Sequence, residues 1–238
     1  MKQAAVADQP RAEIAHAEPQ GLSISVLMAF IAGFVDTCGF VALFNLFTAH
    51  VTGNFVLIGA SLAQHRPGIY GKLLAFPIFV LAVALARWYV LYCERRQRDA
   101  TRPLLMSQMA LLALFLASGV LASPIRDADA PLVILVGMFG VAAMAIQNAA
   151  SRTVFAGHAP TTVMTGNVTQ VVMDLVELML GPDSALVKGR LRKMVLPVFG
   201  FAAGAIVSGL GFALFGFWSI ICPLAALLFV YVYYRRTY

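Results

Sequence analysis

Long apolar runs constrain this chain more than any other feature of its sequence. They cover residues 22–47, 49–63, 73–93, 104–123, 132–150, 161–180 and 194–234. A helix needs about 20 residues to cross a hydrocarbon layer roughly 30 Å thick. The last run is about twice that length, so we expect two helices with a turn near residues 211–216. Backbone groups in hydrocarbon must be satisfied within their own segment, which predicts helices.

The composition supports a membrane protein. Hydrophobic residues make up 61% of the chain and charged residues 12%, with a mean hydropathy of +0.84, whereas a soluble domain carries about 45–50% apolar and about 25% charged residues. The formal net charge is +6, but the basic residues fall in short loops, where they record membrane orientation. We therefore predict an all-α polytopic membrane protein in contact with the lipid bilayer and with no nucleic-acid partner.

A duplicated phrase divides the chain into two related halves. The sequence TAHVTGN at residues 48–54 resembles TTVMTGN at residues 161–167, at an offset of 113 residues. A later match pairs FPIF at residues 76–79 with LPVF at residues 196–199, at an offset of 120. A fixed-period match of this kind indicates repeated architecture. We predict a polar, disordered tail at residues 1–20, a first membrane repeat at 21–125 and a second at 126–238.

The distribution of Lys and Arg distinguishes two topologies. If all eight apolar segments cross the membrane, 11 basic residues fall on the side of the termini and 5 on the other, with Arg87 inside a span. If the two Thr-Gly-Asn segments enter and return, six segments cross and the counts are 13 and 3, the three being Arg66, Lys72 and Arg126. Cytoplasmic loops carry the excess of Lys and Arg, so six spans and cytoplasmic termini are the better prediction.

The choice of topology decides how the two halves are related. Three spans per half give inverted repeats, whose broken helices meet near the midplane in many transporters. Eight spans would instead give parallel repeats, with four apolar segments in each half. We predict three spans plus one Thr-Gly-Asn segment per half, and six to eight membrane helices in all.

Asp36 lies in the middle of the first apolar run. A charge at that depth costs roughly 2.5–3.5 kcal/mol, so the carboxyl must be protonated, paired or next to water. It is either a proton or cation site, or a structural partner of a helix end, of Arg152 or of His50. His50 could titrate near neutral pH or be a hydrogen-bonded packing residue. The matching part of the second half carries Gln147 and Asn148, which we expect to face the same cavity.

The two Thr-Gly-Asn segments carry the remaining candidates. As helices they would place threonines on one face and amides and acids on the opposite face, and two polar faces require protein or water around them. We predict that Thr52, Asn54, Thr165 and Asn167 line a constriction, although such side chains could simply join helices, at about 0.6 kcal/mol per bond. The secondary candidates are Thr48, Thr161, Arg152, Asp174 and Glu177.

The sequence offers no motif for a metal or a nucleotide. It contains no H-E-x-x-H, P-loop or G-x-S-x-G, and we expect no metal site and no cofactor. The cysteines lie far apart in apolar stretches and are predicted to be core residues: Cys38, Cys93 and Cys222. Small residues recur at positions 200, 204 and 208, which predicts close helix packing.

Four short motifs remain: AGFVDTCGF at residues 32–40, TGN at 52–54, QNA at 147–149 and TVMTGN at 162–167. Together they resemble the YoaK family of bacterial membrane proteins. The resemblance covers roughly residues 22–235. It implies an integral protein of a bacterial inner membrane, and it brings no substrate, cofactor or catalytic residue.

Three functions are compatible with these residues. The first is a transporter or channel for a small polar solute or cation, with its site between the two Thr-Gly-Asn segments and Asp36 as the coupling group. The second is a membrane-embedded enzyme that uses Asp36 and His50 as acid and base, which requires both groups at one reacting atom. The third is a non-transporting assembly protein with a dry, tightly packed centre. A homo-oligomer is compatible with each of them.

Overall fold

The computed structural model describes residues 19–181 and 184–237 of the 238. Every secondary-structure element assigned in these residues is a helix. The elements are α1 (Pro19–Ala42), α2 (Gly53–Gln64), α3 (Ile69–Arg95), α4 (Thr101–Ala122), α5 (Pro131–Ser151), α6 (Met164–Leu180), α7 (Ala185–Phe215), the short 3₁₀ helix η1 (Gly216–Ile220) and α8 (Ile221–Thr237). The predicted all-α fold is confirmed. The predicted tail lies outside the described residues up to residue 18, and residues 19 and 20 begin α1.

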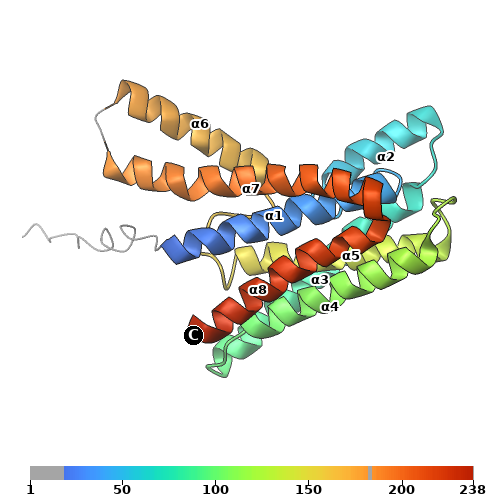
Figure 1. Cartoon of the computed structure of the whole chain (residues 1–238), viewed down its shortest axis with the longest axis horizontal. Coiled ribbons are helices and arrows are strands. Elements are labelled where there is room, and N and C mark those ends of the chain that lie inside the picture. Colours follow the sequence, from blue (N-terminus) through green and yellow to red (C-terminus); the bar gives the residue numbers. More distant parts are fainter. Residues whose placement is uncertain (1–18, 182–183, 238) are drawn as a thin grey trace, which may run out of the picture.

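Five stretches are long and apolar enough to cross a membrane: Ser23–Ala42, Ile69–Arg95, Thr101–Ala122, Pro131–Ser151 and Ala185–Arg235. The fifth contains α7, η1 and α8, and the chain reverses direction between the two long helices (Figure 1). The reversal begins at Gly216, whose φ is 56°, so the predicted turn lies at the end of its expected range. These five stretches are fewer than the six to eight membrane helices predicted, and the count becomes six if α7 and α8, which share the fifth stretch, are counted separately.

Both Thr-Gly-Asn helices are short. Helix α2 has 12 residues, and at about 1.5 Å per residue it is much shorter than the hydrocarbon layer. Helix α6 has 17 residues. In Figure 1 both begin near the centre of the molecule, and they diverge from the body toward opposite ends. Helix α2 packs against α3, and α6 packs against α7.

The segments before α2 and α6 are not helical, which corrects one prediction. Helix α1 ends at Ala42, and Phe44 and Asn45 then adopt positive φ angles of 50° and 63°. Such residues cannot continue a right-handed helix, and the next helix begins only at residue 53. Residues 152–163 are likewise non-helical before α6. The prediction that residues 48–54 and 161–177 form continuous helical faces is therefore wrong for residues 48–52 and 161–163.

Helices α1 and α7 pack with their backbones almost in contact. A Cβ atom added at Gly204 would overlap the carbonyl oxygen of Phe30, and one added at Gly33 would overlap that of Phe201. At Gly200 the added atom would lie 2.7 Å from the carbonyl oxygen of Val26. The close packing predicted from the small residues at positions 200, 204 and 208 is confirmed.

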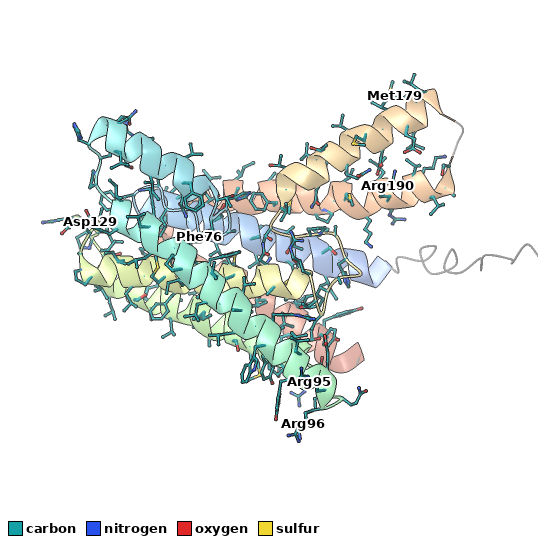
Figure 2. The ribbon with its side chains drawn as sticks, turned by 180° about the vertical axis from the view of Figure 1, so that it is seen from behind. Phe76, Arg95, Arg96, Asp129, Met179 and Arg190 are labelled. Carbon is teal, nitrogen blue, oxygen red and sulfur yellow. The ribbon has the colours of Figure 1, made fainter. Side chains whose placement is uncertain are left out.

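Helices α1 and α5 form the centre of the bundle. They are the most buried of the long helices. Helix α1 packs against α5, α7 and α8, and α5 packs against α3 and α4. The reverse view shows α3 crossing the face of the bundle, with Phe76 in its first third and Arg95 and Arg96 at its far end (Figure 2). The polar segments that precede α2 and α6 are thus held against the two most buried helices.

Candidate functional site

The buried carboxylate of Asp36 anchors the non-helical segment that follows α1. Its Oδ1 accepts backbone N–H groups from Thr48 at 2.8 Å and from Ala49 at 2.7 Å, with longer contacts of 3.4 Å to the N–H of His50 and to the Thr48 hydroxyl. Asp36 and Thr48 are both buried. A chain leaving a helix inside the bundle has backbone donors that no water satisfies, and Asp36 supplies their acceptor.

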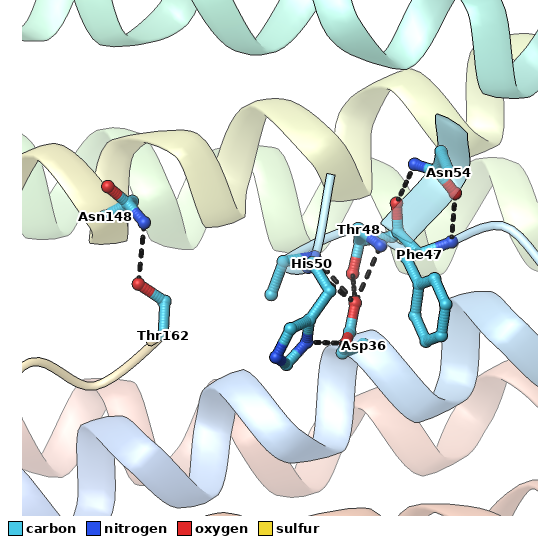
Figure 3. Close-up of polar contacts among 8 residues, drawn as sticks. Asp36, Phe47, Thr48, His50, Asn54, Asn148 and Thr162 are labelled. Carbon is cyan, nitrogen blue, oxygen red and sulfur yellow. Dashed lines mark hydrogen bonds and ion pairs between the residues drawn. The ribbon is translucent and has the colours of Figure 1, made fainter. Parts of the chain in front are cut away.

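The second oxygen of the same carboxylate contacts His50. The distance between Asp36 Oδ2 and His50 Nδ1 is 2.6 Å, and Figure 3 shows the ring lying against the carboxylate. Of the two ion-pair partners expected for Asp36, the structure selects His50 over Arg152. His50 lies in the connecting segment, outside the five long stretches. The hydrogen bond to Asp36 raises the pKa of His50, with burial acting in the opposite direction.

A cavity of about 540 Å³ opens beside this pair. Its charged and titratable lining consists of Asp36 and His50, and the hydroxyls of Thr37 and Thr52 also border it. The rest of its lining is formed by Phe40, Phe47, Gly53 and Phe201. Cavities of this size hold small molecules, which a few polar groups orient among apolar walls. The cavity therefore brings one acid, one imidazole and aromatic surface together.

The asparagines of the two Thr-Gly-Asn phrases bind the main chain. Asn54 Oδ1 accepts the N–H of Phe47 at 3.0 Å, and Asn54 Nδ2 donates to the carbonyl of the same residue at 2.9 Å (Figure 3). In the second half Asn167 Nδ2 donates to the carbonyl of Pro160 at 2.7 Å. Both bonds join residues seven positions apart. Proline has no N–H, so the second half lacks the bond that Phe47 donates in the first.

The second half repeats the side-chain pairing with neutral groups. Asn148 Nδ2 donates to the Thr162 hydroxyl at 2.7 Å, and the two residues are separated by 14 positions, as Asp36 and His50 are (Figure 3). The non-helical segment before α6 is therefore tied to α5 without a charge. Neither Asn148 nor Gln147 borders the 540 Å³ cavity.

Gln147 is part of a buried chain of amides. Its Nε2 donates to the carbonyl of Met28 at 2.7 Å and to the Thr161 hydroxyl at 3.1 Å, and its Oε1 accepts from Gln108 Nε2 at 2.7 Å. The cavity next to Gln147 measures only about 10 Å³, which is at the lower limit for one water molecule. We did not predict Gln108, although a lone amide within an apolar run is the signal that would have indicated it.

Asp174 and Glu177 form an ion-pair cluster with Arg190 of α7. The guanidinium reaches Asp174 at 2.6–3.0 Å and Glu177 at 3.1 Å, and Gln170 donates to Asp174 at 2.7 Å. Asp174 is fully buried, and the bond from Arg190 lowers its pKa. These acids hold α6 on α7, far along the helix from its Thr-Gly-Asn start.

The remaining candidates are exposed. Thr52, Thr165 and Arg152 present exposed side chains, and among the described residues Arg152 forms no ion pair within 4.0 Å. In the part of the chain that the structure describes, no group of three or more His, Cys, Asp or Glu side chains lies close enough to hold a metal ion.

Long apolar helices, buried polar pairs and two short helices that start inside the bundle define a polytopic helical membrane protein. Residues 24–233 match the family described as "Protein of unknown function (DUF1275)", and the chain belongs to that family. It is 26% identical over 150 residues to the UPF0700 transmembrane protein YoaK of Bacillus subtilis (strain 168). The resemblance to the YoaK family is thereby confirmed. That alignment covers 63% of this chain and 64% of the relative. No solved structure matches the chain.

Proposed function

We propose that this protein is a carrier or channel for a small cationic or polar solute, and that the solute passes through the 540 Å³ cavity beside Asp36 and His50. The observation that carries the proposal is the contact, at 2.6 Å, between the buried carboxylate of Asp36 and the half-buried ring of His50 on the wall of that cavity. Placing a carboxylate inside a membrane-spanning bundle costs free energy, and such groups mark ion and proton pathways. Asp36 also accepts backbone N–H groups of the non-helical segment before α2. A change in the charge of the pair therefore changes the hydrogen bonds that hold this segment.

The pattern of helix contacts supports an inverted repeat. Exchanging α1 with α5, α2 with α6, α3 with α7 and α4 with α8 converts the α1–α7 contact into α5–α3, α2–α3 into α6–α7, and α4–α5 into α8–α1. The α1–α5 and α4–α8 contacts map onto themselves. The divergence of α2 and α6 toward opposite ends (Figure 1) has the sense that an inverted repeat requires.

The lining of the cavity favours a cation. Asp36 is its acidic group, and none of its lining residues is Lys or Arg. The faces of Phe40, Phe47 and Phe201 attract cations, above all those that shed water easily. Because Asn54 and Asn167 bind backbone carbonyls, we assign the contacts with the solute to Asp36, His50 and Thr52.

Uptake into liposomes tests this function. Purified protein would be reconstituted into liposomes that enclose a pH-sensitive dye, and the liposomes would be exposed to potassium, ammonium or methylammonium gradients. We expect uptake of at least one cation, and a reduction of tenfold or more in Asp36→Asn, which keeps hydrogen-bond acceptors and removes the charge. Asn148→Ala is the matched control, because it breaks the equivalent pair away from the cavity. Absence of uptake for all three cations, or equal uptake in Asp36→Asn and the control, would refute the proposal.

A membrane-embedded enzyme is the second candidate. The specific observation in its favour is that Asp36 and His50 are in contact, which is how a carboxylate orients an imidazole that acts as general base. The cavity borders the hydroxyls of Thr37 and Thr52, which could act as nucleophiles. An enzyme would lose turnover in Thr37→Val or Thr52→Val, whereas a cation pathway would retain uptake in at least one of these variants.

The third candidate, a non-transporting assembly protein, is favoured by the nearly filled space beside Gln147. It predicts that liposomes containing the protein are no more permeable than empty ones.

We place the protein in the bacterial inner membrane with its termini in the cytoplasm, on the basis of the Lys and Arg distribution. Single cysteines at His65 and Gln97, in a variant without the native cysteines, would be labelled on intact cells with an impermeant thiol reagent. Labelling at His65 and protection at Gln97 support this orientation, and the reverse contradicts it.

A further inference from the structure

A second cavity lies between the end of α1, helix α2 and the start of α3. Its volume is about 410 Å³, and its polar lining residues are Asn45, Ser61, Gln64, Arg66 and Lys72. None of its lining residues is acidic. This cavity shares no residue with the one beside Asp36, and the proposed solute pathway does not use it.

Lys72 is a buried cation on this cavity. The residue is 3% exposed, and Nζ donates to the carbonyls of Phe44 at 2.8 Å and Gly68 at 3.0 Å. An ammonium group has three donors, and among the described residues no carboxylate lies within 4.0 Å of it. Asp129 acts on it only at longer range and does not line the cavity. Buried charges are normally paired, so the ammonium group of Lys72 would be stabilised by a bound anion.

Arg66 places a second cation on the same cavity. It is exposed at the mouth, and within the described residues its side chain forms no ion pair. A role for Lys72 limited to satisfying the carbonyls of Phe44, just after α1, and Gly68, just before α3, would explain its two bonds. It would not explain a second unpaired cation, a hydroxyl and two amides around one cavity.

The second half of the chain shows what is missing here. At the offset of 113 residues, Ser61 corresponds to Asp174 and Gln64 to Glu177. In the second half these two acids bind Arg190 between α6 and α7. In the first half the same positions between α2 and α3 are neutral, while Arg66 and Lys72 remain without a carboxylate partner. A bound oxyanion would supply the charge that two side chains supply in the other half.

We propose that the 410 Å³ cavity binds a phosphate or carboxylate oxyanion between Lys72 and Arg66, with Ser61, Gln64 and Asn45 as neutral hydrogen-bond partners. Arginine and lysine together suit such a ligand, because the guanidinium fork matches two oxygens and the ammonium group acts as a compact charge. The chemistry is shared by a free anion and by the phosphate of a lipid headgroup, and experiment separates these sources.

The test is the unfolding temperature of the full chain in an uncharged, phosphorus-free detergent. Inorganic phosphate would be titrated at an ionic strength held constant with sodium chloride. We expect a saturable rise in unfolding temperature for the wild type and for Asp36→Asn. In Arg66→Ala the phosphate affinity should fall about tenfold, since charge-assisted bonds of this kind contribute that much or more. Arg126→Ala is the matched control, because it removes a nearby exposed charge that does not line the cavity.

Ser61→Asp provides a test that does not depend on losing stability. It installs the acid found at the equivalent position of the second half, and we expect it to raise the unfolding temperature without phosphate and to abolish the response to phosphate. An equal rise in chloride and phosphate, or an unchanged response in both Arg66→Ala and Ser61→Asp, would overturn the proposal.

A lipid arm identifies the source of the anion. Phosphatidylglycerol would be added to the same micelles in phosphate-free buffer. If the lipid raises the unfolding temperature and removes the effect of phosphate, the ligand is a headgroup. If phosphate acts and the lipid does not, the ligand is a water-soluble oxyanion. If neither acts on the wild type, the cavity is not an anion site.

Discussion

Replacing Asp36 with alanine tests how the broken segment after α1 is held. The carboxylate accepts two short backbone bonds, from Thr48 at 2.8 Å and from Ala49 at 2.7 Å. Both donors are buried, so Asp36→Ala leaves them without an acceptor. Each unsatisfied buried donor costs about 1–3 kcal/mol, and we therefore expect a loss of about 2–6 kcal/mol in the free energy of unfolding.

Asp36→Asn is the informative comparison. Its amide oxygen can still accept both N–H groups, so only the charge assistance and part of the contact with His50 are lost, and the expected cost is about 1–2 kcal/mol. The assay is denaturant unfolding in mixed micelles, together with hydrogen exchange of the amides of residues 48–50, which should exchange faster in Asp36→Ala. Equal stability of the two variants, with unchanged exchange at residues 48–50, would refute the view that Asp36 anchors this segment.

Three further predictions follow from the packing and the polar contacts. Gly204→Ala forces a methyl group onto a backbone carbonyl of α1 and should destabilise the protein by about 1–3 kcal/mol. In Gly209→Ala, on the same helix, the added methyl group meets nothing within 4 Å, and the change should be neutral or stabilising by up to about 1 kcal/mol. Thermal unfolding measures both effects. Asn54→Ala should cost more than Asn167→Ala, because Asn54 makes two bonds to the main chain and Asn167 makes one, and urea unfolding of the two variants gives the difference. The contribution of His50 to stability should be fully present below the ordinary histidine pKa of about 6.5 and should be lost as pH rises through its raised folded-state pKa; unfolding titrations from pH 5 to 9 on the wild type and His50→Gln would detect it.

Each of these predictions has an outcome that contradicts it. Equal loss in Gly204→Ala and Gly209→Ala would mean that the backbones of α1 and α7 are not in close contact. A larger loss for Asn167→Ala would mean that the hydrogen bond from Asn167 to Pro160 contributes more to stability than the two hydrogen bonds between Asn54 and Phe47. A stability difference between wild type and His50→Gln that grows with pH would reverse the assigned direction of the pKa shift.

The sequence determined the class of the protein and the position of its polar segments. Apolar runs of about 20 residues can bury their backbone in a membrane only as helices, and this alone predicted an all-helical fold. The duplicated phrase marked the two places where the chain departs from long helices, and the recurrence of small residues near position 204 predicted the close contact between α1 and α7. These features are local or periodic, so a single sequence contains them.

Only the tertiary structure decided which polar groups meet. Helical periodicity extended residues 48–54 into a helix, whereas the chain turns at Phe44 and Asn45, and this turn brings His50 back to Asp36. The sequence offered Arg152 and His50 as partners of Asp36. The distance from Asp36 to each candidate depends on the path of the chain and not on its composition. The same holds for Gln108 with Gln147 and for Arg190 with Asp174, which lie 39 and 16 residues apart. Apolarity and period fix each helix separately, but a hydrogen bond between two helices depends on how they pack, and that is set by the whole fold.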